Sequence, residues 1–109
     1  MKIVDYTTAG GKNLIIEYIE DLPKKEKVEA YVIRKEIEVG GMQAIDELNT
    51  RQLKGKLWEI KFSQNRIMYV VKDKDVVHFL HACKKQKGKA EKFELDTAIQ
   101  RAKNLKLMG

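Results

Sequence analysis

The spacing of apolar residues changes from helical in the first half of the chain to strand-like in the second. A short apolar segment at residues 3–6 predicts an opening strand, and a stripe of apolar positions over residues 14–22 predicts a helix. Pro23 ends this helix, because proline disfavours helical geometry in the preceding residue, and it can begin a second one. The second helix is expected to run to about Val39 and to stop at Gly40–Gly41. Its predicted buried side consists of Val28, Tyr31, Val32 and Ile37.

Residues 42–50 indicate a connecting turn, in which the pattern also allows a short helical piece at Ala44–Leu48. Three strands and a last helix are predicted after this turn. Alternating apolar residues predict a half-buried strand over 57–62, and two further strands follow at 67–71 and 76–83. Helical spacing over 95–105 predicts a C-terminal amphipathic helix. The order β-α-α-β-β-β-α indicates an α+β domain, with an antiparallel sheet, two N-terminal helices packed on one face and the other face partly open.

Composition supports one folded unit. With 109 residues, 43% of them hydrophobic and 35% charged, the chain has room for a single domain spanning residues 1–109. We find no apolar stretch typical of a signal peptide and none approaching the roughly 18–20 residues that span a bilayer. The single cysteine, Cys83, excludes an intrachain disulfide. We therefore expect a cytoplasmic protein with no membrane partner.

Positive charge is concentrated in the second half of the chain. The net charge is +6, yet residues 1–50 carry seven Lys and Arg against ten Asp and Glu, whereas residues 51–109 carry fifteen against six. A basic region on a small domain attracts polyanions, of which nucleic acid is the commonest. The alternative is a surface with scattered lysines that serve solubility alone.

Five lysines lie within residues 84–92, directly after an apolar strand. They either bind phosphates or form a solvated segment that protects a sheet edge. Arg66 begins the preceding strand, and its planar guanidinium suits a phosphate that gains charge during a reaction. Neighbouring antiparallel strands bring opposite residues within about 5 Å, so Lys61, Arg66 and the Lys84–Lys85 pair are expected to converge on one sheet edge. Other candidate phosphate-binding residues are Lys54, Lys56, Lys87, Lys89 and Lys92.

No metal site is predicted. His78 and His81 lie at an odd separation on the last strand, so they are expected on opposite faces, with His81 sharing its face with Phe79 and Cys83. Two divergent histidines and one cysteine fall short of a convergent ligand set. Trp58 follows the alternating pattern of its strand and is expected in the core.

Several segments resemble HigB-like, phage-derived toxins of the RelE/ParE superfamily. The resemblance rests on residues 53–62 (Leu-Lys-Gly-Lys-Leu-Trp-Glu-Ile-Lys-Phe), on 65–71 (Asn-Arg-Ile-Met-Tyr-Val-Val) and on 76–87. Upstream, residues 18–25 (Tyr-Ile-Glu-Asp-Leu-Pro-Lys-Lys) resemble the family's helix end. Together these segments extend over most of the chain, from about residue 14 to 105, and imply a RelE-like fold.

The resemblance implies the toxin of a type II toxin–antitoxin pair, which enters the ribosomal A site and cuts mRNA without a metal or cofactor. Arg66 matches the family arginine that stabilises the phosphate. Lys61 and the Lys84–Lys85 pair lie near its other basic positions, and His81 takes the acid role if it faces the site. The chain has no Tyr or His after His81, which departs from relatives that carry a proton donor near the C-terminus.

The implied partners are the ribosome with its mRNA and a cognate antitoxin, expected to be a helix-turn-helix, HigA-like protein in a toxin–antitoxin hetero-oligomer. DNA would be contacted only through that antitoxin. Two alternatives keep the fold without catalysis: a ParE-like toxin that inhibits gyrase, or a basic nucleic-acid-binding accessory protein.

Overall fold

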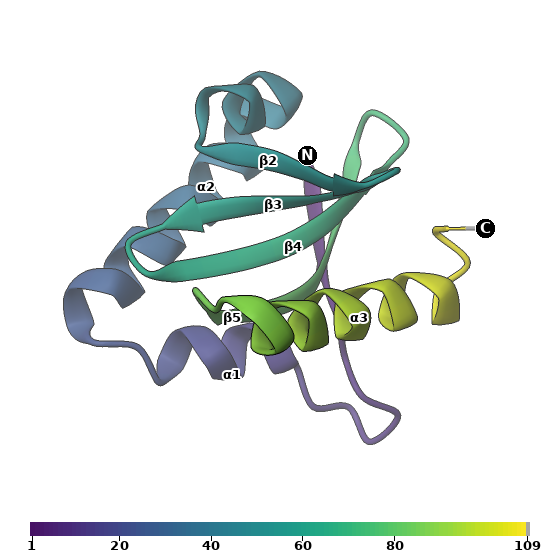
Figure 1. The fold of residues 1–109 in the computed structure, drawn as a ribbon. Helices are drawn as coiled ribbons and strands as arrows, with labels where there is room; N and C mark the ends of the chain where they lie inside the picture. Colours follow the sequence, from purple (N-terminus) through teal and green to yellow (C-terminus); the bar gives the residue numbers. More distant parts are fainter. Residues whose placement is uncertain (109) are drawn as a thin grey trace.

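The computed structural model describes residues 1–108, which form five strands and three helices (Figure 1). The predicted α+β class is confirmed. In chain order the elements are β1 (Lys2–Asp5), α1 (Leu14–Glu20), α2 (Lys24–Glu47), β2 (Thr50–Lys54), β3 (Leu57–Phe62), β4 (Asn65–Lys72), β5 (Val76–Lys84) and α3 (Gly88–Asn104).

The five strands form one mixed sheet in the order β1-β5-β4-β3-β2. Strands β2 to β5 are antiparallel to their neighbours, but β1 pairs in parallel with β5, with Val4 opposite His78. The prediction of a wholly antiparallel sheet is therefore wrong for β1. Strand direction at this edge depends on where α1 and α2 return the chain, and the short apolar segment of β1 carries no information about that path.

Strand β2 is missing from the predicted order because its sequence has no strand pattern. Its residues, Thr-Arg-Gln-Leu-Lys, are polar and mostly exposed, and they pair with β3 at the edge of the sheet. Basic residues are common on such edges because they discourage pairing with other chains. The residues of β2 do not predict a strand by themselves. The segment is extended because it pairs with β3, whose alternating pattern is strong.

Two apolar clusters occupy the two faces of the sheet. On one face, α1 and α2 pack against β3, β4 and β5 through Ile15, Ile19 and Ile37. On the other face, Ala98 and Ala102 of α3 pack against the same strands. Helix α3 covers this second face mainly over β4 and β5 (Figure 1). Trp58 remains about one-third exposed, contrary to its expected place in the core.

Helix α2 is broken where the sequence predicts its end. Gly41 has a non-helical backbone, with φ of 63° and ψ of −142°, so the first helical part stops at the predicted Gly40–Gly41, and a second helical part runs up to Glu47. The buried side is also rotated from the predicted one, because Ala30, Ile33 and Ile37 are buried. Of the residues expected to be buried, three are exposed: Val28, Tyr31 and Val32. No helix of residues 1–108 is both long and apolar enough to cross a membrane.

The lysine-rich segment is split between two elements. Lys84 ends β5 and Lys87 caps α3, whereas Lys89 and Lys92 lie on the first turns of that helix. Lysine has good helix propensity, so the helix extends well before its first periodic apolar residue. Lys89 and Lys92 are consequently presented by a helix, whereas Lys84 belongs to the sheet and Lys85 to the connection between the two elements.

A β-bulge in β5 places both histidines on the face covered by α3. His81 is opposite Met68 and His78 is opposite Val70, and Met68 and Val70 both belong to the α3-side cluster. The extra residue of the bulge shifts the alternation, so the expectation of opposite faces is wrong. Phe79 lies in the cluster on the other face, so His81 does not share a face with it.

Candidate functional site

A polar cavity of about 270 Å³ lies where the β3–β4 turn meets the end of β5. Lys61 and Phe62 enter it from the end of β3, and Arg66 enters from the start of β4. The cavity contains three of the cationic residues predicted for the site. Its lining consists of Asn49, Lys61, Phe62, Ser63, Gln64, Asn65, Arg66 and Lys85.

Backbone hydrogen bonds fix the walls of this cavity. The Lys85 N–H donates to the Gln64 carbonyl oxygen at 2.7 Å, and the Lys61 N–H donates to the Asn49 carbonyl oxygen at 2.8 Å. The turn itself is tied to α2, because the Ser63 hydroxyl donates to Glu29 at 2.8 Å. The lysines therefore project from a backbone that the sheet holds in place.

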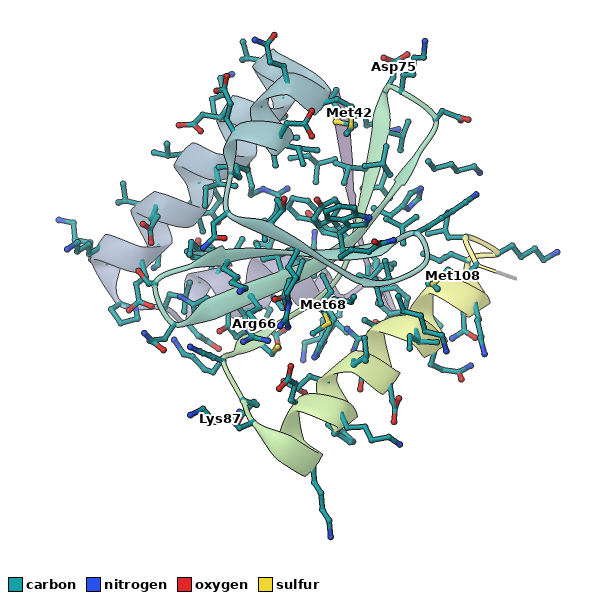
Figure 2. The ribbon with its side chains drawn as sticks, turned by 45° about the horizontal axis from the view of Figure 1, so that its top comes forward. Met42, Arg66, Met68, Asp75, Lys87 and Met108 are labelled. Atoms are coloured by element: carbon teal, nitrogen blue, oxygen red, sulfur yellow. The ribbon has the colours of Figure 1, made fainter. Side chains whose placement is uncertain are left out.

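Arg66 is the most buried cation of the site, with only 8% of its side chain exposed. Its Nη1 lies 3.4 Å from Glu59 Oε1 and 3.5 Å from Glu91 Oε1. Arg51 contacts the same two carboxylates, with distances of 3.1 Å to Glu59 and 3.4 Å to Glu91. Figure 2 shows Arg66 beside Met68, on the side of the sheet that α3 covers. Two arginines and two glutamates thus form one ion network between the sheet and α3.

This network positions Arg66 without using all of its donors. Glu59 is fully buried, so it compensates the guanidinium charge in a place that water does not reach. The Arg66 Nε has no hydrogen-bond partner among residues 1–108. A buried donor left unpaired costs about 1–3 kcal/mol, and an incoming anion can recover that cost.

Asn65 connects the cavity with both N-terminal helices. Its Oδ1 accepts from the Tyr18 hydroxyl at 2.6 Å and from Lys84 Nζ at 2.9 Å, and its Nδ2 donates to Glu26 at 2.7 Å. Burial raises the pKa of Tyr18 well above its usual value, so this hydroxyl stays protonated and continues to donate. Lys84 also lies 3.6 Å from Glu26, so its charge is compensated at this point.

The structure brings some of the predicted site residues together and separates others. Lys61, Arg66 and Lys85 line the polar cavity, and Lys84 is next to it through Asn65. His81 lies elsewhere: it lines a second cavity with Tyr18 and Arg101. The acid role implied for His81 therefore has no support from its position.

The lysines predicted to bind RNA are dispersed. Lys54 and Lys56 flank the β2–β3 turn at the far end of β3 from the cavity, and Lys56 lines a different, partly apolar cavity with Trp58. Lys87 lies on the segment that leads into α3 (Figure 2) and is exposed, as is Lys89. Lys92 is 3.6 Å from Asp96. None of these five lysines lines the polar cavity.

Sequence reasoning missed the residues that hold the site together. Glu59 alternates with apolar residues on β3, a pattern that does not predict its burial, and the structure buries it completely. Its partner Arg51 lies directly opposite it on β2, a segment without a strand pattern, and Glu91, the other carboxylate that contacts Arg51, comes from α3, far along the sequence. One signal could have revealed this ion pair: Arg66 and Glu59 carry opposite charges and lie on adjacent predicted strands.

Comparison with known proteins identifies the family. Residues 17–103 match the model of the family described as Phage derived protein Gp49-like (DUF891), which is a RelE/toxin-like family. The chain belongs to this family, because the match covers most of its length. No curated protein gives a significant match.

Proposed function

We propose that this protein is the toxin of a type II toxin–antitoxin pair, of the HigB-like branch, and that it cuts mRNA on translating ribosomes. The observation that carries the proposal is the convergence of Lys61, Arg66 and Lys85 on one cavity of about 270 Å³. Three cations around a small polar cavity suit a phosphate group of RNA. Membership of a RelE/toxin-like family supports the same reading.

The proposed reaction uses the RNA's own nucleophile. The ribose 2′-oxygen gives its proton to water and attacks the adjacent phosphorus, the bond from phosphorus to the 5′-oxygen breaks, and that oxygen takes up a proton from a lysine of the cavity. The products are a 2′,3′-cyclic phosphate and a free 5′-hydroxyl. The protein needs to hold the phosphate in line, stabilise its additional negative charge and supply the proton, none of which requires a metal ion.

Arg66 is assigned to the stabilisation of the charged phosphorus, because its guanidinium stays ionised and is held rigidly by Glu59. Lys61 and Lys85 line the same cavity and are assigned to phosphate binding and to protonation of the leaving oxygen. The small number of such groups suits an enzyme that relies on the ribosome to orient the mRNA.

The proposal includes the partners expected of such a toxin. A cognate antitoxin of the helix-turn-helix, HigA-like kind restrains the protein in a hetero-oligomer, and DNA is reached only through that antitoxin. Ribosome and mRNA are the targets, and the cytoplasm is the compartment where they meet.

The test adds the purified chain to a translating extract and maps the new mRNA 5′ ends. Cleavage within the translated region, giving 5′-hydroxyl ends that need a kinase before ligation, is the expected result. The same mRNA without ribosomes should stay largely intact. Intact mRNA in both samples would refute the proposal, and inhibition of gyrase supercoiling in that case would point to a ParE-like toxin.

Binding of RNA should depend on salt through the lysines of the cavity. Lys85→Ala is expected to weaken binding of a short single-stranded RNA and to reduce the slope of log K against log salt by about 1, because one phosphate contact is lost. Lys74→Ala is the matched control, since it removes the same charge at the opposite end of β4, in the β4–β5 turn. Fluorescence anisotropy measures the binding. Equal slopes of log K against log salt for the two variants would show that Lys85 does not contact the RNA phosphate.

A further inference from the structure

A second group of reactive side chains lies between β5 and α3, outside the Arg66 cavity. His81 and Cys83 come from β5 and Glu94 comes from α3, elements that pack side by side (Figure 1). One ligand atom from each of the three lies within 4.8 Å of the other two. The proposed ribonuclease reaction uses none of these residues.

Cys83 is buried, whereas 14% of the His81 side chain and 17% of the Glu94 side chain are exposed. His81 Nε2 has no hydrogen-bond partner among residues 1–108, although Glu94 Oε1 is 3.2 Å away.

We propose that His81, Cys83 and Glu94 bind a borderline-soft divalent cation such as Zn²⁺. In a tetrahedral zinc site with bonds of about 2.0–2.3 Å, the donor atoms lie about 3.3–3.7 Å apart. The observed limit of 4.8 Å therefore requires the donors to close by about 1 Å. Sulfur and imidazole donors select zinc-like ions over Mg²⁺ or Ca²⁺, which prefer oxygen.

A cavity of about 240 Å³ lies beside His81. Tyr18 and Arg101 line it together with His81, and it has room for a water molecule. Arg101 Nη1 lies 3.2 Å from His81 Nδ1, and it also donates to the Leu80 carbonyl oxygen at 2.9 Å. When the cation binds, Arg101 can lose its contact with the His81 imidazole and keep its hydrogen bond to the Leu80 carbonyl oxygen. The positive charge of Arg101 lowers the affinity of the site for a cation.

Bound cation would fasten α3 to the sheet next to the Arg66 network. Glu94 lies one turn after Glu91, which contacts Arg66 and Arg51. A cation held by β5 and Glu94 therefore fixes the turn of α3 that carries Glu91. The metal site would stabilise the packing of α3 without entering the polar cavity.

Titration of the full chain with Co²⁺, which replaces Zn²⁺ and is visible by absorption, tests the proposal. A sulfur-to-cobalt charge-transfer band is expected, and it can only arise from Cys83, the single cysteine. Zn²⁺ should abolish the band by competition. His81→Ala and the isosteric Glu94→Gln should each weaken Co²⁺ binding at least about tenfold, since loss of even an outer-shell partner costs that much.

His78→Ala is the matched control, because it removes the only other histidine and should leave the affinity unchanged. Absence of the band at millimolar Co²⁺ would overturn the proposal. A band that Cys83→Ser removes but that His81→Ala and Glu94→Gln leave intact would also overturn it, as binding to a thiol alone. The titration contains no ribosome or RNA, so its failure leaves the ribonuclease proposal untouched.

Discussion

Replacement of Arg66 with lysine should lower the rate of mRNA cleavage by about 10²–10³-fold, the usual cost of removing one group that stabilises a developing anion. Lysine keeps the positive charge that compensates the buried Glu59, so the fold should persist. It loses the planar guanidinium that contacts two anionic oxygens at once, and for this reason the exchange is not conservative. The rate is measured in the translating extract by primer extension.

Arg34→Lys is the matched control for this experiment. Arg34 forms a two-pronged, partly buried contact with Asp5, at 2.8 and 2.9 Å, and it does not line the polar cavity. Its replacement should leave cleavage unchanged apart from any loss of stability, which urea unfolding reports. Wild-type cleavage by a folded Arg66→Lys variant would show that the guanidinium has no part in the reaction.

Removal of the buried carboxylate of Glu59 should lower the free energy of unfolding much more than removal of the exposed carboxylate of Glu91. Glu59→Ala is expected to lower the free energy of unfolding by about 3–5 kcal/mol, because it leaves Arg66 buried without its main counter-charge. Glu91→Ala should cost less than about 1 kcal/mol, since 41% of that side chain is exposed and its ion pairs are screened by water. Urea unfolding of both variants measures the difference.

A double variant separates burial of charge from packing. Glu59→Leu combined with Arg66→Met replaces the ion pair by apolar side chains of similar size, and should recover most of the stability that Glu59→Ala loses. Cleavage should be lost in the double variant, because it lacks the guanidinium of Arg66. Equal losses for Glu59→Ala and Glu91→Ala would contradict the assignment of Glu59 as the buried counter-charge of Arg66.

The site was only partly predictable from the sequence. Lys61 and Arg66 are direct neighbours across β3 and β4, so strand alternation and a short turn were enough to place them together. Lys85 joins them because the β4–β5 register brings the end of β5 beside the β3–β4 turn. Glu91 escaped detection because the start of α3 contains no apolar periodicity, and its contact with Arg66 depends on how the whole helix docks.

The sequence by itself determined the α+β class, the hairpins β3–β4 and β4–β5, and the amphipathic character of the last helix, since these follow from interactions between residues close along the chain. Only the tertiary structure decided that β1 is parallel, that β2 is a strand and that α3 covers the second face. It also decided the bulge that redirects His81 and the burial of Glu59. Those features depend on pairing and packing between distant segments. The spacing of apolar residues within one segment does not determine the free energy of these interactions.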